Sequence, residues 1–232
     1  MAEQLPVEFE FRANQTFAEY FPGGNEEIIG ELKKAVAGIG EQLLFLWGNT
    51  GQGKSHLLHA CCHEASLLGF SAFYLNCRQS AVLPPDVFNG LEGIDVVCID
   101  NLDALAGFAD LELALFNFFN QHRSNGCRII LSASCAPKVI ALALPDLKTR
   151  INWGLSLKIQ PLADNDKIAA LSHKAQQLGF EFTPKAVKFL LTRYDRSLSS
   201  LWLALNKLDV ASLSAQRKLT IPFLKEVLKN EP

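Results

Sequence analysis

The chain contains the run Gly48-Asn49-Thr50-Gly51-Gln52-Gly53-Lys54-Ser55, which fits the pattern G-x-x-x-x-G-K-[ST] in full. This pattern predicts a loop that binds nucleotide phosphates, because its glycines let backbone N–H groups turn toward phosphate oxygens. Lys54 would supply positive charge to the β- and γ-phosphates, and the Ser55 hydroxyl would hold Mg²⁺. A helix starting there adds its positive dipole end. We therefore predict a nucleotide site running from Gly48 to His56.

The residues around this loop predict the order strand, loop, helix that the pattern requires. Residues 41–47 form a short apolar run, and 54–68 suit a helix. Another helix is expected from Glu26. Alternation of apolar runs with helical stretches is typical of a doubly wound parallel α/β sheet. The further expected strands are 70–77, 95–100, 128–132 and 156–159, with a helix at 111–124 between the third and fourth of the five strands.

The strand pattern stops after Pro161, and helical stretches follow at 164–178, 184–194, 198–213 and from Thr220. Leu201, Trp202, Leu205 and Leu208 make a stripe that we interpret as the core of a helical bundle. Residues 1–24 have no regular period and include prolines and glycines, which favours an extended arm free to reach a partner. The expected organisation is an arm at 1–24, a nucleotide-binding α/β domain at 25–161 and a small helical lid domain at 162–232.

Composition indicates a globular, cytoplasmic protein. Of the 232 residues, 49% are hydrophobic and 20% charged, and no apolar run approaches the ~20 residues needed to span a bilayer. There is no signal-peptide pattern either. The net charge is -2, so no global basic field favours sequence-independent binding of duplex DNA.

The cysteines and histidines do not predict a metal centre. The six cysteines contain no C-x-x-C pair, and we interpret them as small buried hydrophobic residues in a reducing compartment. His56, His59 and His63 would share one helix face near Cys62. No further ligand completes a tetrahedral shell in register, so a structural role is favoured over metal binding.

A second phosphate-site motif is the apolar run 96–99 followed by Asp100. A carboxylate at the end of such a strand reaches Mg²⁺ in many P-loop proteins, so Ser55 and Asp100 are the predicted metal-associated pair. The next residue is Asn101, where most hydrolytic relatives place a second acid that orients water. Loss of a positioned base costs ~10² to 10⁴ in rate. We therefore expect weak or no intrinsic ATPase activity.

Taken together, these residues resemble the AAA+ core of the DnaA family, and most closely its short regulatory members, over nearly the whole chain. The resemblance rests on the order and spacing of several stretches: 47–48 before the phosphate loop, 54–60 after it, 99–101, Leu147-Lys148-Thr149-Arg150, Asn152-Trp153-Gly154 and 215–223. It implies an AAA+ fold with a helical lid. The printed sequence ends at Pro232, just after the expected lid, so we expect no origin-reading domain of the kind that follows in the full initiator.

The resemblance also implies roles for single residues. Arg150 takes the place of an arginine finger, which reaches from one subunit to the γ-phosphate of ATP held by its neighbour; a surface ion pair is the alternative. Ser134 falls where relatives place a polar sensor of the γ-phosphate, although it would also suit a turn cap. Ser199 stands where relatives carry a second sensor arginine, and Arg196, one turn earlier, is the candidate replacement unless it is only an exposed helix-entry residue.

The arm contains Gln4-Leu5-Pro6-Val7-Glu8-Phe9, which looks like the short peptide by which replication proteins dock on the DNA polymerase sliding clamp. Leu5 and Phe9 would be apolar anchors, supported by Val7, and the Gln4 amide would make directional hydrogen bonds. A frayed terminus is the alternative. Phe17, Tyr20 and Phe21 fall where relatives wrap the base, but they would equally suit a core.

The resulting hypothesis is a negative regulator of replication initiation. It would hold an adenine nucleotide, with ADP favoured, and Mg²⁺, dock on the clamp, and use Arg150 to stimulate hydrolysis of ATP bound to DnaA. The expected partners are DnaA and the clamp on DNA, with no sequence-specific DNA contact, no membrane and a possible homodimer. Three alternatives stay open: a stand-alone AAA+ ATPase such as a helicase loader or clamp loader, a clamp–DnaA adaptor without a chemical role, and, more remotely, a small-molecule kinase.

Overall fold

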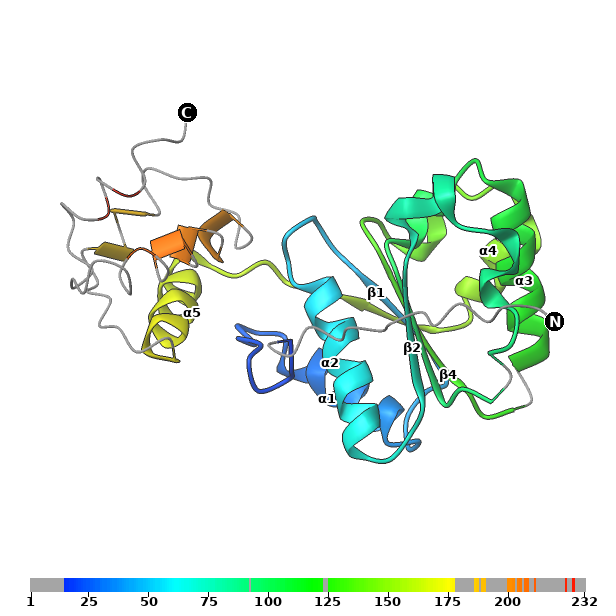
Figure 1. Cartoon of the computed structure of the whole chain (residues 1–232), viewed down its shortest axis with the longest axis horizontal. Coiled ribbons are helices and arrows are strands. Elements are labelled where there is room, and N and C mark those ends of the chain that lie inside the picture. Colours follow the sequence, from blue (N-terminus) through cyan, green and yellow to red (C-terminus); the bar gives the residue numbers. More distant parts are fainter. Residues whose placement is uncertain are drawn as a thin grey trace. The chain divides into compact units, whose positions relative to one another are not determined.

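A computed structural model describes residues 15–91, 93–122 and 125–177 of the chain, together with residues 186, 187, 189, 190, 200–202, 204, 205, 207, 208, 211, 224 and 227. The chain separates into two compact units, Met1–Gln160 and Pro161–Pro232. Figure 1 draws both, and each is considered by itself.

The first unit is built on one sheet of five strands. All four strand pairs are parallel, and the spatial order is β2-β3-β4-β1-β5. The predicted doubly wound α/β fold is therefore confirmed, with observed strands that begin and end within a few residues of the predicted ones. The strands are β1 (Leu43–Trp47), β2 (Ala72–Asn76), β3 (Val96–Asp100), β4 (Arg128–Ala133) and β5 (Leu155–Lys158).

Helices cover both faces of this sheet, which explains why its inner strands β1, β3 and β4 are nearly continuous apolar runs. Successive residues of a strand point to opposite faces, so Phe45 joins one hydrophobic cluster and Leu44 and Leu46 join the other. The helices α1 (Glu26–Val36) and α2 (Lys54–Leu67) lie on one face, and α3 (Ala109–His122) and α4 (Pro145–Ile151) on the other (Figure 1).

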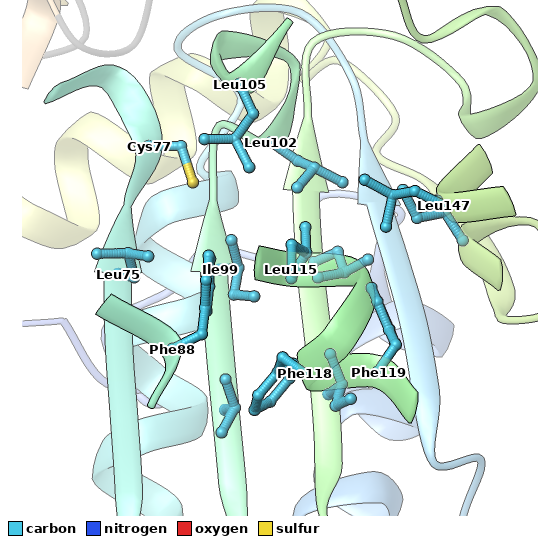
Figure 2. Packing of buried hydrophobic residues seen from close by; sticks show 14 of the residues in the cluster. Leu75, Cys77, Phe88, Ile99, Leu102, Leu105, Leu115, Phe118, Phe119 and Leu147 are labelled. Carbon is cyan, nitrogen blue, oxygen red and sulfur yellow. The ribbon is translucent and has the colours of Figure 1, made fainter. Parts of the chain in front are cut away.

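The cluster on the α3 and α4 face is the larger of the two. In Figure 2, Leu115, Phe118 and Phe119 of α3 lie over the strands, and Leu147 of α4 lies beside them. Short 3₁₀ segments complete this side of the unit at Cys77–Val82, Pro85–Phe88, Leu102–Leu105 and Pro137–Val139. The segment Leu102–Leu105 buries both of its leucines in the same cluster.

Residues 15–24 differ from the expected free arm. They form turns against the domain, and Phe17 is buried in the cluster that α1 and α2 share. Asn25, at the start of α1, is also buried, and its side chain accepts a hydrogen bond from the Gln160 N–H at 2.7 Å and donates to the Gln160 carbonyl oxygen at 3.1 Å. An apolar anchor and a fixed end hold this segment, so only residues 1–14, outside the described residues, remain for the predicted arm.

The second unit begins with the helix α5 (Asp164–Gln177), in agreement with the predicted helix. The described residues of the next two predicted helical stretches are also helical. Leu201, Leu205 and Leu208 are fully buried in one cluster with Leu171, and Trp202 packs against that cluster. The leucine stripe is therefore bundle core, as its spacing predicts. Over the described residues, none of the helices has both the length and the apolar character needed to cross a bilayer.

Candidate nucleotide-binding site

The predicted phosphate loop joins the carboxyl end of β1 to the start of α2. Its backbone takes positive φ angles at Gly51 (81°) and Gly53 (88°), a region that glycine enters at little cost. Gly53 is the residue that precedes the first turn of α2. A second constraint on Gly53 is steric. A Cβ at this position would lie 2.7 Å from the Tyr20 ring, so there is no room for a side chain.

Lys54 lies within the loop and is 7% exposed. Its ammonium group donates hydrogen bonds to the carbonyl oxygens of Gly48 at 2.6 Å and Asn49 at 2.9 Å. Burial lowers the pKa of the Lys54 amine below its ordinary value, while the negative charges of Asp100 and Asp103 oppose that shift. The loop thus holds the Lys54 ammonium close to two carboxylates. These are Asp100, the last residue of β3, and Asp103, which follows that strand.

Asp100 ends β3 and is fully buried. Three hydroxyl groups donate to its carboxylate: Ser55 at 2.5 Å and Tyr74 at 2.8 Å to one oxygen, and Ser132 to the other. Burial, reinforced by the Asp100 charge, raises the pKa of Tyr74 above its ordinary value, so that hydroxyl keeps its proton and donates. These bonds stabilise a buried negative charge next to Ser55.

Asn101 has a left-handed backbone, with φ 57° and ψ 48°. Its N–H donates to the Ser132 hydroxyl oxygen at 3.1 Å, and its side-chain amide donates to the Asn76 side-chain oxygen at 3.0 Å. An amide cannot serve as the general base that a carboxylate provides at this position. Asn101 therefore cannot accept a proton from an attacking water. Its hydrogen bonds instead link the carboxyl ends of β3, β4 and β2.

Ser134 follows β4 and is exposed. Its hydroxyl donates to one oxygen of Asp103, and its N–H donates to the other at 3.3 Å. Asp103 lies three residues after Asp100, within the 3₁₀ segment that follows β3. The residue predicted as a polar sensor is thus paired with a second carboxylate at the same edge of the sheet.

The segment before α1 contacts the loop. The Tyr20 hydroxyl donates to the Gln52 carbonyl oxygen at 3.4 Å, and burial raises the pKa of Tyr20 to about 12. His56 Nε2 lies 2.8 Å from the Thr16 carbonyl oxygen, and since that oxygen only accepts, Nε2 carries the proton. Tyr20 also meets the His56 ring edge-on. His56 therefore anchors the N-terminal segment. Phe21, the residue after Tyr20, is half-buried.

The other histidines of α2 have separate environments. His59 is buried and stacks on Tyr74, with ring centres 4.0 Å apart, whereas His63 is half-buried. All six thiols are free, and five of them are buried. Among the described residues, no group of three or more His, Cys, Asp or Glu side chains is arranged to hold a metal ion.

Arg150 lies in the last turn of α4, on the far side of the sheet from α2, and its side chain is half-buried. Its guanidinium group stacks near two aromatic rings, 4.6 Å from the centre of Trp153 and 5.8 Å from the centre of Phe116. Trp153 is 57% exposed. Among the described residues, no carboxylate forms an ion pair with Arg150. The guanidinium is therefore partly accessible and held by aromatic rings, without a carboxylate partner among the described residues.

Several predicted site residues lie outside the described residues. These are the clamp-peptide residues Gln4, Leu5, Val7 and Phe9, and the lid residues Arg196 and Ser199. Their roles stay predictions.

Sequence reasoning missed Tyr74, Ser132 and Asp103. Ser132 could have been noticed as a polar residue within the otherwise apolar run 129–133, which is a signal for a buried hydrogen bond. Tyr74 gave no such signal, because its contact with Asp100 depends on the register of β2 against β3, where Asn76 lies opposite Asp100. Asp103 in turn depends on the tight turn that begins at Asn101.

The fold and this site define a class of protein, an α/β P-loop module of the AAA+ type. Most of the chain is similar to solved structures of this class. Domain III of the replication initiation protein DnaA from Thermotoga maritima matches with 20% identity and a TM-score of 0.78, covering 94% of this chain and 97% of that one. AMPPCP-bound DnaA from Aquifex aeolicus matches with 19% identity and a TM-score of 0.76, covering 88% and 68%. The RuvB Holliday junction branch migration motor of Thermotoga maritima matches with 13% identity and a TM-score of 0.70, covering 95% and 73%.

Two family models identify the relatives more closely. The model of the bacterial DnaA ATPase domain matches residues 86–158, and the model of the Hda lid domain matches residues 164–228. An ATPase domain of DnaA type followed by a lid of Hda type is consistent with Hda, the DnaA-homologous regulator. The resemblance inferred from the sequence motifs is therefore confirmed.

Proposed function

We propose that this protein is a negative regulator of replication initiation that stimulates hydrolysis of the ATP bound to DnaA. In this proposal it holds an adenine nucleotide in its own phosphate loop and docks on the DNA-loaded sliding clamp through residues 4–9. Arg150 then enters the nucleotide site of a neighbouring DnaA molecule. The clamp-binding step rests on the sequence of the arm alone.

The observation that carries the proposal is the position of Arg150. The side chain is half-buried, so a neighbouring protein can reach it, and its guanidinium is held over aromatic rings instead of being neutralised by an acid. A guanidinium placed on a γ-phosphate stabilises the charge that develops during transfer and contributes ~10³ to 10⁵ in rate. The chain's own site supports the same division of labour, because Asn101 replaces the usual water-orienting acid.

The residues present fit a nucleotide with its metal. Lys54 and the N–H groups of the phosphate loop are donors for phosphate oxygens, and Ser55 and Asp100 are the oxygen ligands that Mg²⁺ prefers. Ser55 and Asp100 are in direct contact, so the two ligands are already together. Bound Mg²⁺ would neutralise phosphate charge there. We propose ADP as the resident nucleotide, which would make this site structural.

The test is a reconstitution of DnaA loaded with labelled ATP, the clamp on DNA and this protein. The wild-type protein should convert DnaA-bound ATP to ADP, and Arg150→Ala should reduce that conversion to background. Lys148→Ala is the matched control, because it removes a positive charge from the same helix. It should leave the conversion close to wild type.

A double variant, Leu5→Ala with Phe9→Ala, tests docking in the same assay. It should lose stimulation in the presence of the clamp and fail to bind the clamp in a pull-down. Unchanged conversion by Arg150→Ala would sink the proposed chemistry and favour the adaptor alternative. Steady-state ATP hydrolysis by the isolated protein at the rate of a motor would favour a stand-alone ATPase instead.

A further inference from the structure

We infer that Glu112 of α3 is a positioning residue that fixes α4 in place and thereby holds Arg150 where a partner meets it. The inference rests on the proposed function of Arg150. The acid and the arginine do not touch; they act through the same short helix.

Glu112 is buried, with 1% of its surface exposed. A buried carboxylate is costly unless hydrogen bonds or a cation stabilise it. Among the described residues no cation forms an ion pair with Glu112. Its stabilising partners are instead two backbone N–H groups. Ala143 donates to both carboxylate oxygens, at 3.0 and 2.8 Å, and Leu144 donates to one of them at 2.8 Å.

Those two N–H groups belong to the residues immediately before α4. Leu144 is the cap residue of this helix and makes no side-chain cap bond of its own, and Pro145, the first helical residue, has no N–H to offer. Glu112, on a neighbouring helix, therefore supplies the acceptor for the N–H of the cap residue and of the residue before it. The bonds are charge-assisted and directional, so they specify where α4 begins.

The remaining contacts of α4 do not specify its position as closely. Leu147 and Ile151 are fully buried in the cluster that also contains Leu115 of α3 (Figure 2). Apolar contacts of this kind are strong but non-directional, so they specify the start of the helix less closely than hydrogen bonds do. The hydrogen bonds from residues 143 and 144 supply the missing constraint at one end.

Phe116 provides a second contact between the same two helices, at the other end of α4. It lies four residues after Glu112 and hence on the same side of α3, and its ring centre is 5.8 Å from the Arg150 guanidinium. One face of α3 thus holds the entry to α4 through Glu112 and the arginine through Phe116. A displacement of ~1 Å at a group that must meet a transition state costs about 10²-fold in rate, so this double hold matters for catalysis in trans.

The test uses the full chain with Glu112→Leu, which keeps the volume but removes both acceptors, and Glu112→Gln, which keeps one acceptor oxygen. Asp110→Asn is the matched control, because it removes an exposed carboxylate from the same turn of α3. Three quantities are measured: amide hydrogen exchange over residues 141–152, nucleotide affinity of the phosphate loop, and conversion of DnaA-bound ATP at saturating protein. Arg150→Ala is run beside them.

In Glu112→Leu we expect faster exchange of the Ala143 and Leu144 amides and a fall of about 10- to 100-fold in conversion at saturation. Nucleotide affinity should stay within about 3-fold of wild type, since a fall at saturation with intact affinity is the mark of misplacement. Glu112→Gln should be intermediate, and Asp110→Asn should match wild type.

Full conversion by Glu112→Leu, in an experiment where Arg150→Ala is inactive, would overturn this inference and leave the proposed function standing. Loss of nucleotide affinity in parallel with conversion would also overturn it, because the acid would then serve the fold as a whole. If Arg150→Ala converts DnaA-bound ATP normally, the proposed function itself is wrong. Exchange at residues 143 and 144 then shows separately whether Glu112 holds α4.

Discussion

The side-chain amide of Asn101 donates a hydrogen bond to the side-chain oxygen of Asn76, at 3.0 Å, across the carboxyl ends of two neighbouring strands. In a P-loop site that hydrolyses ATP efficiently, we expect an acid directly after the residue in the place of Asp100. Here that position carries an amide committed to a neighbour, in the left-handed backbone region. We therefore expect slow hydrolysis in the protein's own site.

Asn101→Asp should therefore raise intrinsic ATP hydrolysis by at least about 10-fold, given that a positioned base contributes ~10² to 10⁴. Aspartate enters the left-handed region nearly as readily as asparagine, so the variant should fold normally. Single-turnover hydrolysis of bound ATP by the isolated protein measures the effect.

Asn101→Gly is the control for this prediction, because glycine accepts the same backbone angles without adding an acid. It should keep the slow rate of the wild type. An Asn101→Asp variant that hydrolyses ATP no faster than Asn101→Gly would show that the missing acid is not what limits this site.

The stack of Arg150 on Trp153 leads to a second prediction. Arginine offers a planar group that stacks flat on aromatic rings and binds phosphate oxygens in pairs, whereas the lysine ammonium is a point charge without that planar geometry. Arg150→Lys should therefore lose most of the stimulation of DnaA, about 10-fold or more, although the charge is kept. Trp153→Ala should lower it by about 2- to 5-fold, the worth of one exposed cation–π contact.

The conversion assay with DnaA measures both variants, with Trp153→Phe as the control that keeps an aromatic face. Equal activity of the lysine and arginine forms would mean that only a positive charge is needed at residue 150. Increased stimulation by Trp153→Ala would mean that the stack withholds the arginine instead of presenting it.

The fold could be predicted from the sequence because its strongest sequence patterns extend over adjacent residues. The five predicted strands become one parallel sheet in which β1, β3 and β4 are mostly buried, and the phosphate loop fixes β1 and α2 on either side of it. Asp100 could be placed for the same reason, as the end of an apolar run. Patterns that extend over a few adjacent residues need no knowledge of which strands pair.

The missed features depend on pairings between distant segments. The helix α4 has seven residues, too few for a hydrophobic period, and its position depends on Glu112, more than thirty residues earlier. Within the amphipathic pattern of α3, Glu112 has the appearance of an ordinary exposed acid. Phe17 is buried by contacts with α1 and α2, and a single aromatic residue between turns does not signal this.

Lys54 gives a prediction that depends on pH. Burial lowers the pKa of its amine from the ordinary 10.5, so the folded protein without nucleotide favours the neutral amine more than the unfolded chain does. The resulting penalty on stability is present below the lowered pKa and is relieved as the pH rises through it toward 10.5. Nucleotide binding has the opposite preference, because phosphate requires the charged amine.

Nucleotide affinity should accordingly fall as the pH is raised from neutrality, and the fall should begin below the ordinary lysine value. Lys54→Met should bind about 10- to 100-fold more weakly at neutral pH, the worth of a charged hydrogen bond, and should show no such fall. Titrations with a fluorescent ADP analogue at several pH values measure both proteins. Wild-type affinity that stays constant up to pH 10.5 contradicts the lowered pKa.

Gly154 joins α4 to β5, and its constraint is steric. A Cβ at this position would lie 2.6 Å from Leu43 Cγ and 2.8 Å from the Leu43 carbonyl oxygen, at the start of β1. Backbone atoms of a central strand cannot move aside, so Gly154→Ala should lower the free energy of unfolding by about 1–3 kcal/mol. That corresponds to a fall of several degrees in Tm for a chain of this size.

Gly30→Ala is the control for Gly154→Ala, since a Cβ at Gly30 in α1 meets no atom within 4 Å. Alanine inside a helix should stabilise the protein by about 0.5–1 kcal/mol, which is a change of opposite sign. Thermal unfolding of the three proteins, followed by circular dichroism, compares them. Because Trp153 adjoins Gly154 and Arg150 stacks on Trp153, the displaced β5 start should also weaken stimulation of DnaA below the melting transition. A Gly154→Ala protein with wild-type Tm would show that β1 and β5 separate easily, and this glycine would then have no part in holding the arginine.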